Sequence, residues 1–297
     1  MGAKKKLLLL LGGAAALLAA LAALVTFLKP EEPSQEIPFL SMDSVTRITL
    51  EWPEETTTLE LGEEWTDPED PNYPIRQSIL ENMATTAQNI TAQRQLENDA
   101  QTGLDTPALT VTLINESQSV TFSFGECNSL TGDYYASLEG GVYTLSEEVY
   151  NAFAYTKEGL YAPQAPMELE ENIASLEVQW EGNTLSLVHD GDSWSFAGDS
   201  QTQPDQTKVD SLISQLGYTQ TSMTITDLAQ VEQDRTTQPY ATVTALGSEA
   251  AYFEVSAPDQ EGYAWLWDSS TGYLHRVSWQ SVSLWLETAA AILEGGE

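Results

Sequence analysis

The sequence predicts an α+β protein with an N-terminal transmembrane helix and two tandem repeats, each built from an antiparallel sheet plus helices. Residues 7–28 form one uncharged run that consists almost wholly of Leu and Ala. After it come short segments that alternate apolar and polar residues and are joined by turn residues, a pattern typical of antiparallel strands. The order of these segments, and of the helical patterns between them, recurs in the second half of the chain, which indicates an internal repeat.

The uncharged run is long enough to span a bilayer. At about 1.5 Å per residue, a helix of this length covers roughly 30 Å, the thickness of the hydrocarbon core. Three lysines at residues 4–6 precede it, and basic flanks stay on the cytoplasmic side. We therefore expect a single-pass protein of the cell membrane, with residues 1–6 in the cytoplasm, residues 7–28 as the anchor and the rest outside the cytoplasm. Residues 29–41 are rich in Pro and Glu and are expected to form an extended tether.

A cleaved signal peptide is the alternative, because residues 20–22 read Ala-Leu-Ala, a small-x-small pattern typical of cleavage sites. The apolar core of such a peptide usually has about 7–15 residues, so the longer run here favours the anchor. Cys127 is the sole cysteine of the sequence. No lipid-accepting cysteine follows the run, and no internal disulfide can form. A free thiol outside the cell could pair with another chain, but we interpret Cys127 as a small apolar residue beside the strand at residues 119–124.

The chain after the anchor is strongly acidic. Four of the 11 Lys and Arg lie at or before Lys29, so the remaining seven face all 45 acids and the formal charge of this part is 7 − 45 = −38. Nucleic-acid binding needs a basic surface, and docking on anionic lipid is disfavoured for the same reason. We interpret the charge as a well-solvated surface that can also attract cations or a basic partner.

Residues 42–160 are predicted to form the first repeat. Its pattern begins with two strands and a short third strand, continues with a helix whose apolar residues recur every three or four positions, and ends with four strands and a helix. The strands are expected at residues 45–52, 57–61, 64–66, 109–114, 119–124, 134–138 and 142–145, and the helices at residues 75–90 and 146–155. Ser146 lies at the start of the closing helix, where a serine cap is favoured.

Residues 161–172 contain prolines and acids and are predicted to link the first repeat to the second, residues 173–297. In the second repeat the strands are expected at residues 173–180, 184–189, 241–246, 251–255, 263–267 and 274–277, and the helices at residues 208–216 and 279–293. Trp180 corresponds to Trp52, and Trp194 corresponds to Trp65 at almost the same separation along the chain. Because such matches fall on core and turn residues, we interpret the two halves as a tandem duplication.

The first half also carries a series of short motifs. They are an opening V-x-x-I-x-L strand at residues 45–50, Trp65 before a Pro-rich loop, GLDTP at 103–107, FSFGE at 122–126, DYYASL at 133–138 and VYTLS at 142–146. On these motifs the chain resembles the DUF4340 family of bacterial envelope proteins, closely over residues 42–160 and more distantly over residues 173–290. The resemblance implies two tandem copies, the second more divergent, and carries over no catalytic residue. Some relatives resemble auxiliary subunits of gliding-motility-type ABC transporters, which implies a transporter component as a partner.

No motif assigns a catalytic residue, a metal ligand or a cofactor. The two histidines, His189 and His275, lie in different predicted elements, and neither H-E-x-x-H nor C-x-x-C occurs, so no transition-metal site is predicted. Residues 191–193 read Gly-Asp-Ser, as in one esterase class, but a hairpin turn needs a glycine at this point of the repeat. The acid runs at residues 67–70 and 190–192 lack the spacing of a calcium loop.

Aromatic residues are the strongest candidates for a binding site. Tyr263, Trp265 and Trp267 alternate along one predicted strand, so their side chains project from the same face. Tyr134 and Tyr135 occupy the corresponding strand of the first repeat. A row of exposed aromatic residues could bind sugar rings or a protein partner. The alternative is that these rings face the core of the sheet, beneath the helix at residues 279–293.

Two functions remain open. The first is a non-catalytic binding or assembly module of the cell envelope, whose partner is an unknown envelope protein such as a component of an ABC-type transporter. The alternative is an envelope hydrolase, similar to a glycosidase, whose two carboxylates would lie about 5–9.5 Å apart.

Overall fold

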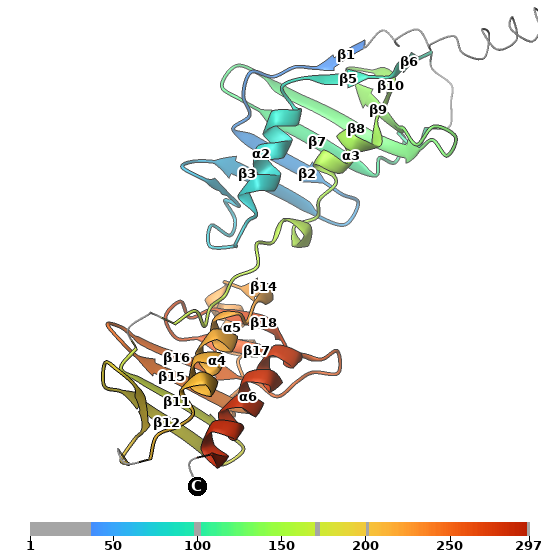
Figure 1. The fold of residues 1–297 in the computed structure, drawn as a ribbon. Helices are drawn as coiled ribbons and strands as arrows, with labels where there is room; N and C mark the ends of the chain where they lie inside the picture. Colours follow the sequence, from blue (N-terminus) through green and yellow to red (C-terminus); the bar gives the residue numbers. More distant parts are fainter. Residues whose placement is uncertain (1–36, 98–101, 170–172, 200–201, 296–297) are drawn as a thin grey trace, which may run out of the picture.

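A computed structural model describes residues 37–97, 102–169, 173–199 and 202–295 of the chain (Figure 1). The predicted cytoplasmic segment, the anchor at residues 7–28 and most of the tether lie outside the described residues. Among the described residues, no helix has both the length and the apolar character needed to cross a membrane.

The first unit is an eight-stranded antiparallel sheet with helices on one face (Figure 1). In spatial order its strands are β4 (Trp65–Thr66), β3 (Thr56–Leu61), β2 (Arg47–Glu51), β7 (Leu109–Ile114), β8 (Ser119–Cys127), β9 (Tyr134–Leu138), β10 (Gly141–Leu145) and β6 (Arg94–Leu96). The covering helices are α2 (Gln77–Thr86) and α3 (Glu147–Phe153). Alternation along the strands turns one set of side chains, such as Phe122 and Phe124, toward Phe153 of α3, and these residues are buried together. A separate two-stranded sheet pairs β1 (Ile37–Leu40) with β5 (Ile90–Ala92).

The second unit repeats this architecture. Its sheet runs β13 (Trp194–Phe196), β12 (Asn183–His189), β11 (Ser175–Trp180), β15 (Ala241–Leu246), β16 (Ala250–Val255), β17 (Tyr263–Asp268), β18 (Leu274–Ser278) and β14 (Thr221–Ile225). Helices α4 (Gln206–Gly217) and α6 (Trp279–Glu294) supply core residues against one face, among them the fully buried Trp285. A short additional helix, α5 (Leu228–Asp234), follows β14.

The strand order is therefore the same in both units when the strands are matched along the chain. The match extends to side chains. The amide of Gln77 donates to the Trp65 carbonyl and accepts from the Trp65 N–H, both at 2.8 Å. Gln206 makes the same two bonds to Trp194, at 3.0 and 2.8 Å. The prediction of two antiparallel sheets with helices in an α+β fold is confirmed.

Several predicted boundaries are wrong. The helix expected at residues 75–90 ends at Thr86, and Ile90 belongs to β5. The expected tether ends in a strand, since Phe39 and Leu40 are buried in β1. The prediction also missed two edge strands, β6 and β14, and the helix α5. Both edge strands are short and rich in polar residues, so their pairing with β10 and β18, rather than a hydrophobic pattern, places them in the sheets.

The predicted linker is hydrogen-bonded to both units over its first residues. Ala162 donates its N–H to the Pro74 carbonyl at 2.9 Å in the first unit. Thr221 of β14, in the second unit, donates its backbone N–H to the Gln164 carbonyl of the linker at 2.9 Å. These bonds join the linker to both units, and the linker is the yellow-green segment that runs between them in Figure 1.

Candidate functional site

The predicted aromatic row on β17 lies on the face of the second sheet opposite its core. The residues that alternate with it, Ala264 and Leu266, are buried in the core cluster that includes α6. Tyr263, Trp265 and Trp267 are only partly buried. The alternative that these rings are packed beneath the closing helix is therefore wrong, because Ala264 and Leu266 occupy that position.

One arginine lies directly on this row. Arg235, which caps the C-terminus of α5, places its guanidinium carbon 3.3 Å from the centre of the Trp267 ring. The same guanidinium pairs with Glu254 of β16, with Nη2 2.7 Å from Oε1. Tyr252 donates its hydroxyl to Glu254 at 3.1 Å and lies edge-on to Trp267. The guanidinium is thus held between a carboxylate and an indole face, two favourable partners for it.

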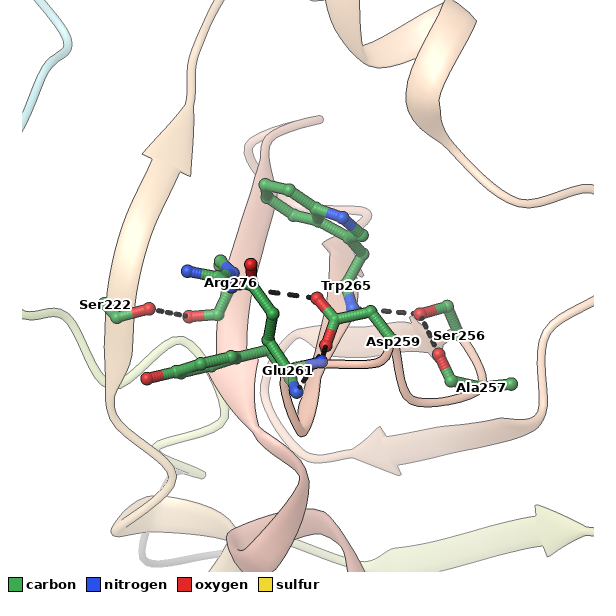
Figure 2. A network of polar contacts seen from close by, with 8 residues as sticks. Ser222, Ser256, Ala257, Asp259, Glu261, Trp265 and Arg276 are labelled. Atoms are coloured by element: carbon green, nitrogen blue, oxygen red, sulfur yellow. Dashed lines mark hydrogen bonds and ion pairs between the residues drawn. The ribbon is translucent and has the colours of Figure 1, made fainter.

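A second arginine repeats this arrangement on the neighbouring strand. Arg276 of β18 is the register partner of Trp265 and lies 3.8 Å above the Tyr263 ring. It forms ion pairs with Glu261 and, at 3.7 Å, with Asp259 of the loop before β17 (Figure 2). The N–H groups of Tyr263 and Glu261 and the charge of Arg276 lower the pKa of Asp259, which keeps this carboxylate ionised.

We call Tyr252, Tyr263, Trp265, Trp267, Arg235 and Arg276 the aromatic–arginine cluster. The two arginines are the functional candidates that were not predicted from the sequence. Only seven Lys and Arg residues follow Lys29. Because basic residues are so scarce, each arginine could have been examined as a candidate from the sequence, and two of the seven lie on this one face.

The corresponding face of the first unit is different. Ser146 and Ser278 cap the two closing helices, so they align the final strands of the two units, and Thr144 then corresponds to Arg276. Tyr135 is the register partner of Thr144, and Trp265 is the register partner of Arg276, so Tyr135 corresponds to Trp265. By the same alignment Ser137 replaces Trp267. Paired hydroxyl groups cover much of the rest of this face, at Thr49–Thr58, Thr110–Ser123 and Thr112–Thr121. Of the predicted pair in the first unit, Tyr134 stacks on Tyr150 of α3 at 3.8 Å on the core side, so it shares no face with Tyr135.

The remaining candidates have structural roles. Asp190 accepts the N–H groups of Asp192 and Ser193, which lowers its pKa and closes the predicted hairpin turn. Asp67 pairs with Lys157 at 2.6 Å. Cys127 is the last residue of β8 and is exposed, so it is not buried like a small apolar residue and its thiol is free. In the described part of the chain, no group of three or more His, Cys, Asp and Glu could hold a metal ion.

Residues 65–241 match the family model described as "Domain of unknown function (DUF4340)". The chain belongs to the DUF4340 family. The matched region begins in β4 of the first unit, includes the linker and ends at Ala241, the first residue of β15 in the second unit. A search of the curated proteins and one of the solved structures found no match.

The segments at residues 102–107 and 122–126 lie against each other in the first unit. The N–H of Glu126 in FSFGE donates to the Thr102 carbonyl, next to GLDTP, at 2.8 Å. A Cβ on Gly125 would lie 2.1 Å from that carbonyl oxygen, so only glycine permits this approach. These two segments therefore fix the local architecture of the first unit, whereas the aromatic–arginine cluster lies in the second unit.

Proposed function

We propose that this protein is a non-catalytic binding module of the cell envelope, anchored by residues 7–28, which docks to a protein partner through the aromatic–arginine cluster. The observation that supports the proposal is the concentration of Trp, Tyr and Arg on an open sheet face. These three residue types dominate the energetics of protein interfaces.

The geometry favours a protein surface over a sugar. Guanidinium groups already cover one face of the Trp267 and Tyr263 rings, so these faces cannot stack on a pyranose. The ion pairs to Glu254 and Glu261 also hold the long arginine side chains in place. A face whose side chains are already ordered loses less conformational entropy when it binds.

The charge of the cluster indicates the chemistry of the partner. Acidic groups at Glu254, Asp259 and Glu261 border the rings and neutralise the two arginines. The rest of the chain after the anchor is also strongly acidic. The proposed partner therefore presents apolar side chains surrounded by Lys and Arg, and its association rate falls as salt rises. A membrane component of an ABC-type transporter is the partner we propose.

Site-specific photo-crosslinking tests this function in the full chain. A benzoyl-phenylalanine at position 265 is expected to give one adduct of defined mass in native membranes, and the same group at the matched position 135 to give none. The adduct should weaken in Arg276→Ala and at high salt, and its captured protein should bind the purified chain with the same dependence.

Equal adducts from positions 265 and 135, or no adduct from either, would overturn the proposal. Hydrolysis of a glycan panel by the purified full chain, unaffected by Trp265→Ala, would instead support the hydrolase alternative.

A further inference from the structure

A cavity of about 410 Å³ lies where the two units meet. One wall comes from the first unit, with Trp65, Tyr73 and the neighbouring prolines. The linker closes a second side with residues from 162–166. The second unit supplies the rest from β14, β17, β18 and the turn between β17 and β18. Its volume is within the range of small-molecule sites, which often form at domain interfaces.

His275 lines this cavity and is 4% exposed. Its Nδ1 lies 2.9 Å from the Thr224 hydroxyl, whereas its Nε2 is buried and has no hydrogen-bond partner among the described residues. A buried polar atom without a partner destabilises the folded protein. His275 therefore contributes to the cavity wall an imidazole with one unpartnered, buried nitrogen.

The neighbouring hydroxyl groups assign the proton on this imidazole. The backbone N–H of Gln164 donates to Thr221 at 2.8 Å, so the Thr221 hydroxyl hydrogen is available for Tyr161. Tyr161 lies 2.7 Å from the Thr224 hydroxyl, which in turn contacts His275. Every hydroxyl hydrogen in this series has an acceptor only if Thr221 donates to Tyr161, Tyr161 donates to Thr224 and Thr224 donates to His275. Nδ1 is then an acceptor, and Nε2 carries the hydrogen.

The lining residues also restrict the charge of a ligand. They include the carboxylates of Glu64 and Asp268 but no Lys or Arg. Burial lowers the pKa of His275 to about 4, against the opposing effect of Asp268, so the imidazole is neutral near pH 7. An anion would meet only negative charge, whereas the aromatic and proline side chains provide apolar surface.

We propose that this cavity binds a small uncharged molecule, of the size and chemistry of a pyranose sugar, that accepts a hydrogen bond from His275 Nε2 and packs its apolar face on the aromatic walls. The site is separate from the aromatic–arginine cluster and does not depend on the function proposed for it.

Nitrogen NMR of the histidine-labelled full chain tests the site, because the sequence contains only two histidines. The free protein should show His275 as the Nε2–H tautomer. Glucose or N-acetylglucosamine at millimolar concentration should shift Nε2 of His275 and leave His189 unchanged, while inorganic phosphate and acetate should shift neither. The absence of a shift with both sugars, or a shift with the anions, would overturn the proposal.

Calorimetric titration of variants provides the second measurement. His275→Phe removes the donor and should weaken sugar binding about tenfold, as expected for the loss of one buried hydrogen bond. His189→Gln is the matched control and should bind as the parent does. Tyr273→Ala changes a partly buried wall residue instead and should also weaken binding, which keeps the test decisive if His275→Phe fails to fold. The proposal would be contradicted if both cavity variants bound the sugar as tightly as the parent protein does. It would also be contradicted if the added sugar changed crosslinking at position 265, because the two sites are proposed to be separate.

Discussion

The two units share one strand order but present different surfaces on their open sheet faces. The first unit covers this face with paired hydroxyl groups, as at Thr112 and Thr121. The second places two tryptophans there, with Arg235 and Arg276 beside them. Core positions are constrained by packing on the helices, whereas the open faces are free to differ. The second unit is therefore the one whose open face is suited to recognising a partner.

A second difference lies at the edge strand beside the final strand of each sheet, β6 in the first unit and β14 in the second. Gln95 of β6 and Tyr143 of β10 are register partners in the first unit; Gln95 is exposed, and Tyr143 is partly buried edge-on against Phe39. Thr224 and His275 are the corresponding partners in the second unit and are buried at the junction. The corresponding pair of strands therefore carries an exposed edge residue, Gln95, in the first unit and forms a cavity wall in the second.

The largest expected effects test whether the two cores are independent. Phe122→Ala should destabilise the first unit, and Trp285→Ala the second, each by about 3–5 kcal/mol, because both side chains are almost fully buried in separate clusters. Calorimetry with limited proteolysis would assign each transition to its unit. Leu130→Ala, at a side chain that is 93% exposed, is the control. If each core variant shifted both transitions equally, the units would be a single cooperative domain.

The buried histidine should give the second unit a pH dependence that the first lacks. The pKa of His275 is about 4 in the folded state against 6.5 when unperturbed, so between these values the unfolded chain binds the proton and the folded chain does not. Stability is therefore complete above pH 6.5 and falls by roughly 3 kcal/mol as the pH drops toward 4.

Urea denaturation across this range would measure the loss, and His275→Phe should abolish it while His189→Gln retains it. An unchanged pH slope in His275→Phe would show that other groups, such as Asp268, cause the dependence.

The matched glutamines offer a test of equivalence. Gln77→Ala and Gln206→Ala should each lower the free energy of unfolding by roughly 1–3 kcal/mol. Each substitution removes both hydrogen bonds to a tryptophan backbone that is partly shielded from water. Denaturation midpoints of the two units would compare the losses. Substituting the exposed Gln118 with Ala should change neither midpoint, and a large effect in only one unit would break the structural equivalence of the repeats.

The smallest expected effects compare surface ion pairs. Arg235→Ala should cost about 1 kcal/mol, since the guanidinium contacts both Trp267 and Glu254. Arg47→Ala in the first unit should cost no more than about 0.5 kcal/mol, because its pair with Glu60 is largely exposed. Denaturation at low and high salt would separate the two, and equal losses would remove the distinction between the two faces.

The sequence by itself determined the α+β class, most of the central strands and the serine cap of the first closing helix. These features depend on local properties: alternation sets the strands at residues 109–114 and 263–267, and the Ser146 side chain accepts the Val149 N–H. The aromatic row was also predictable, because Tyr263, Trp265 and Trp267 must share a face whatever covers the other side.

Only the tertiary structure decided which face that was, and what lay beside it. Alternation shows that a strand has two different faces, but the position of α6 determines that Ala264 and Leu266 are the buried pair. Arg235 reaches Trp267 from the end of α5, an element separated from β17 by two other strands of the chain, and His275 is buried because β14 and the linker meet at its strand. Such contacts join residues that are distant in the chain, so no local pattern contains them, and the junction exists only once both sheets have formed.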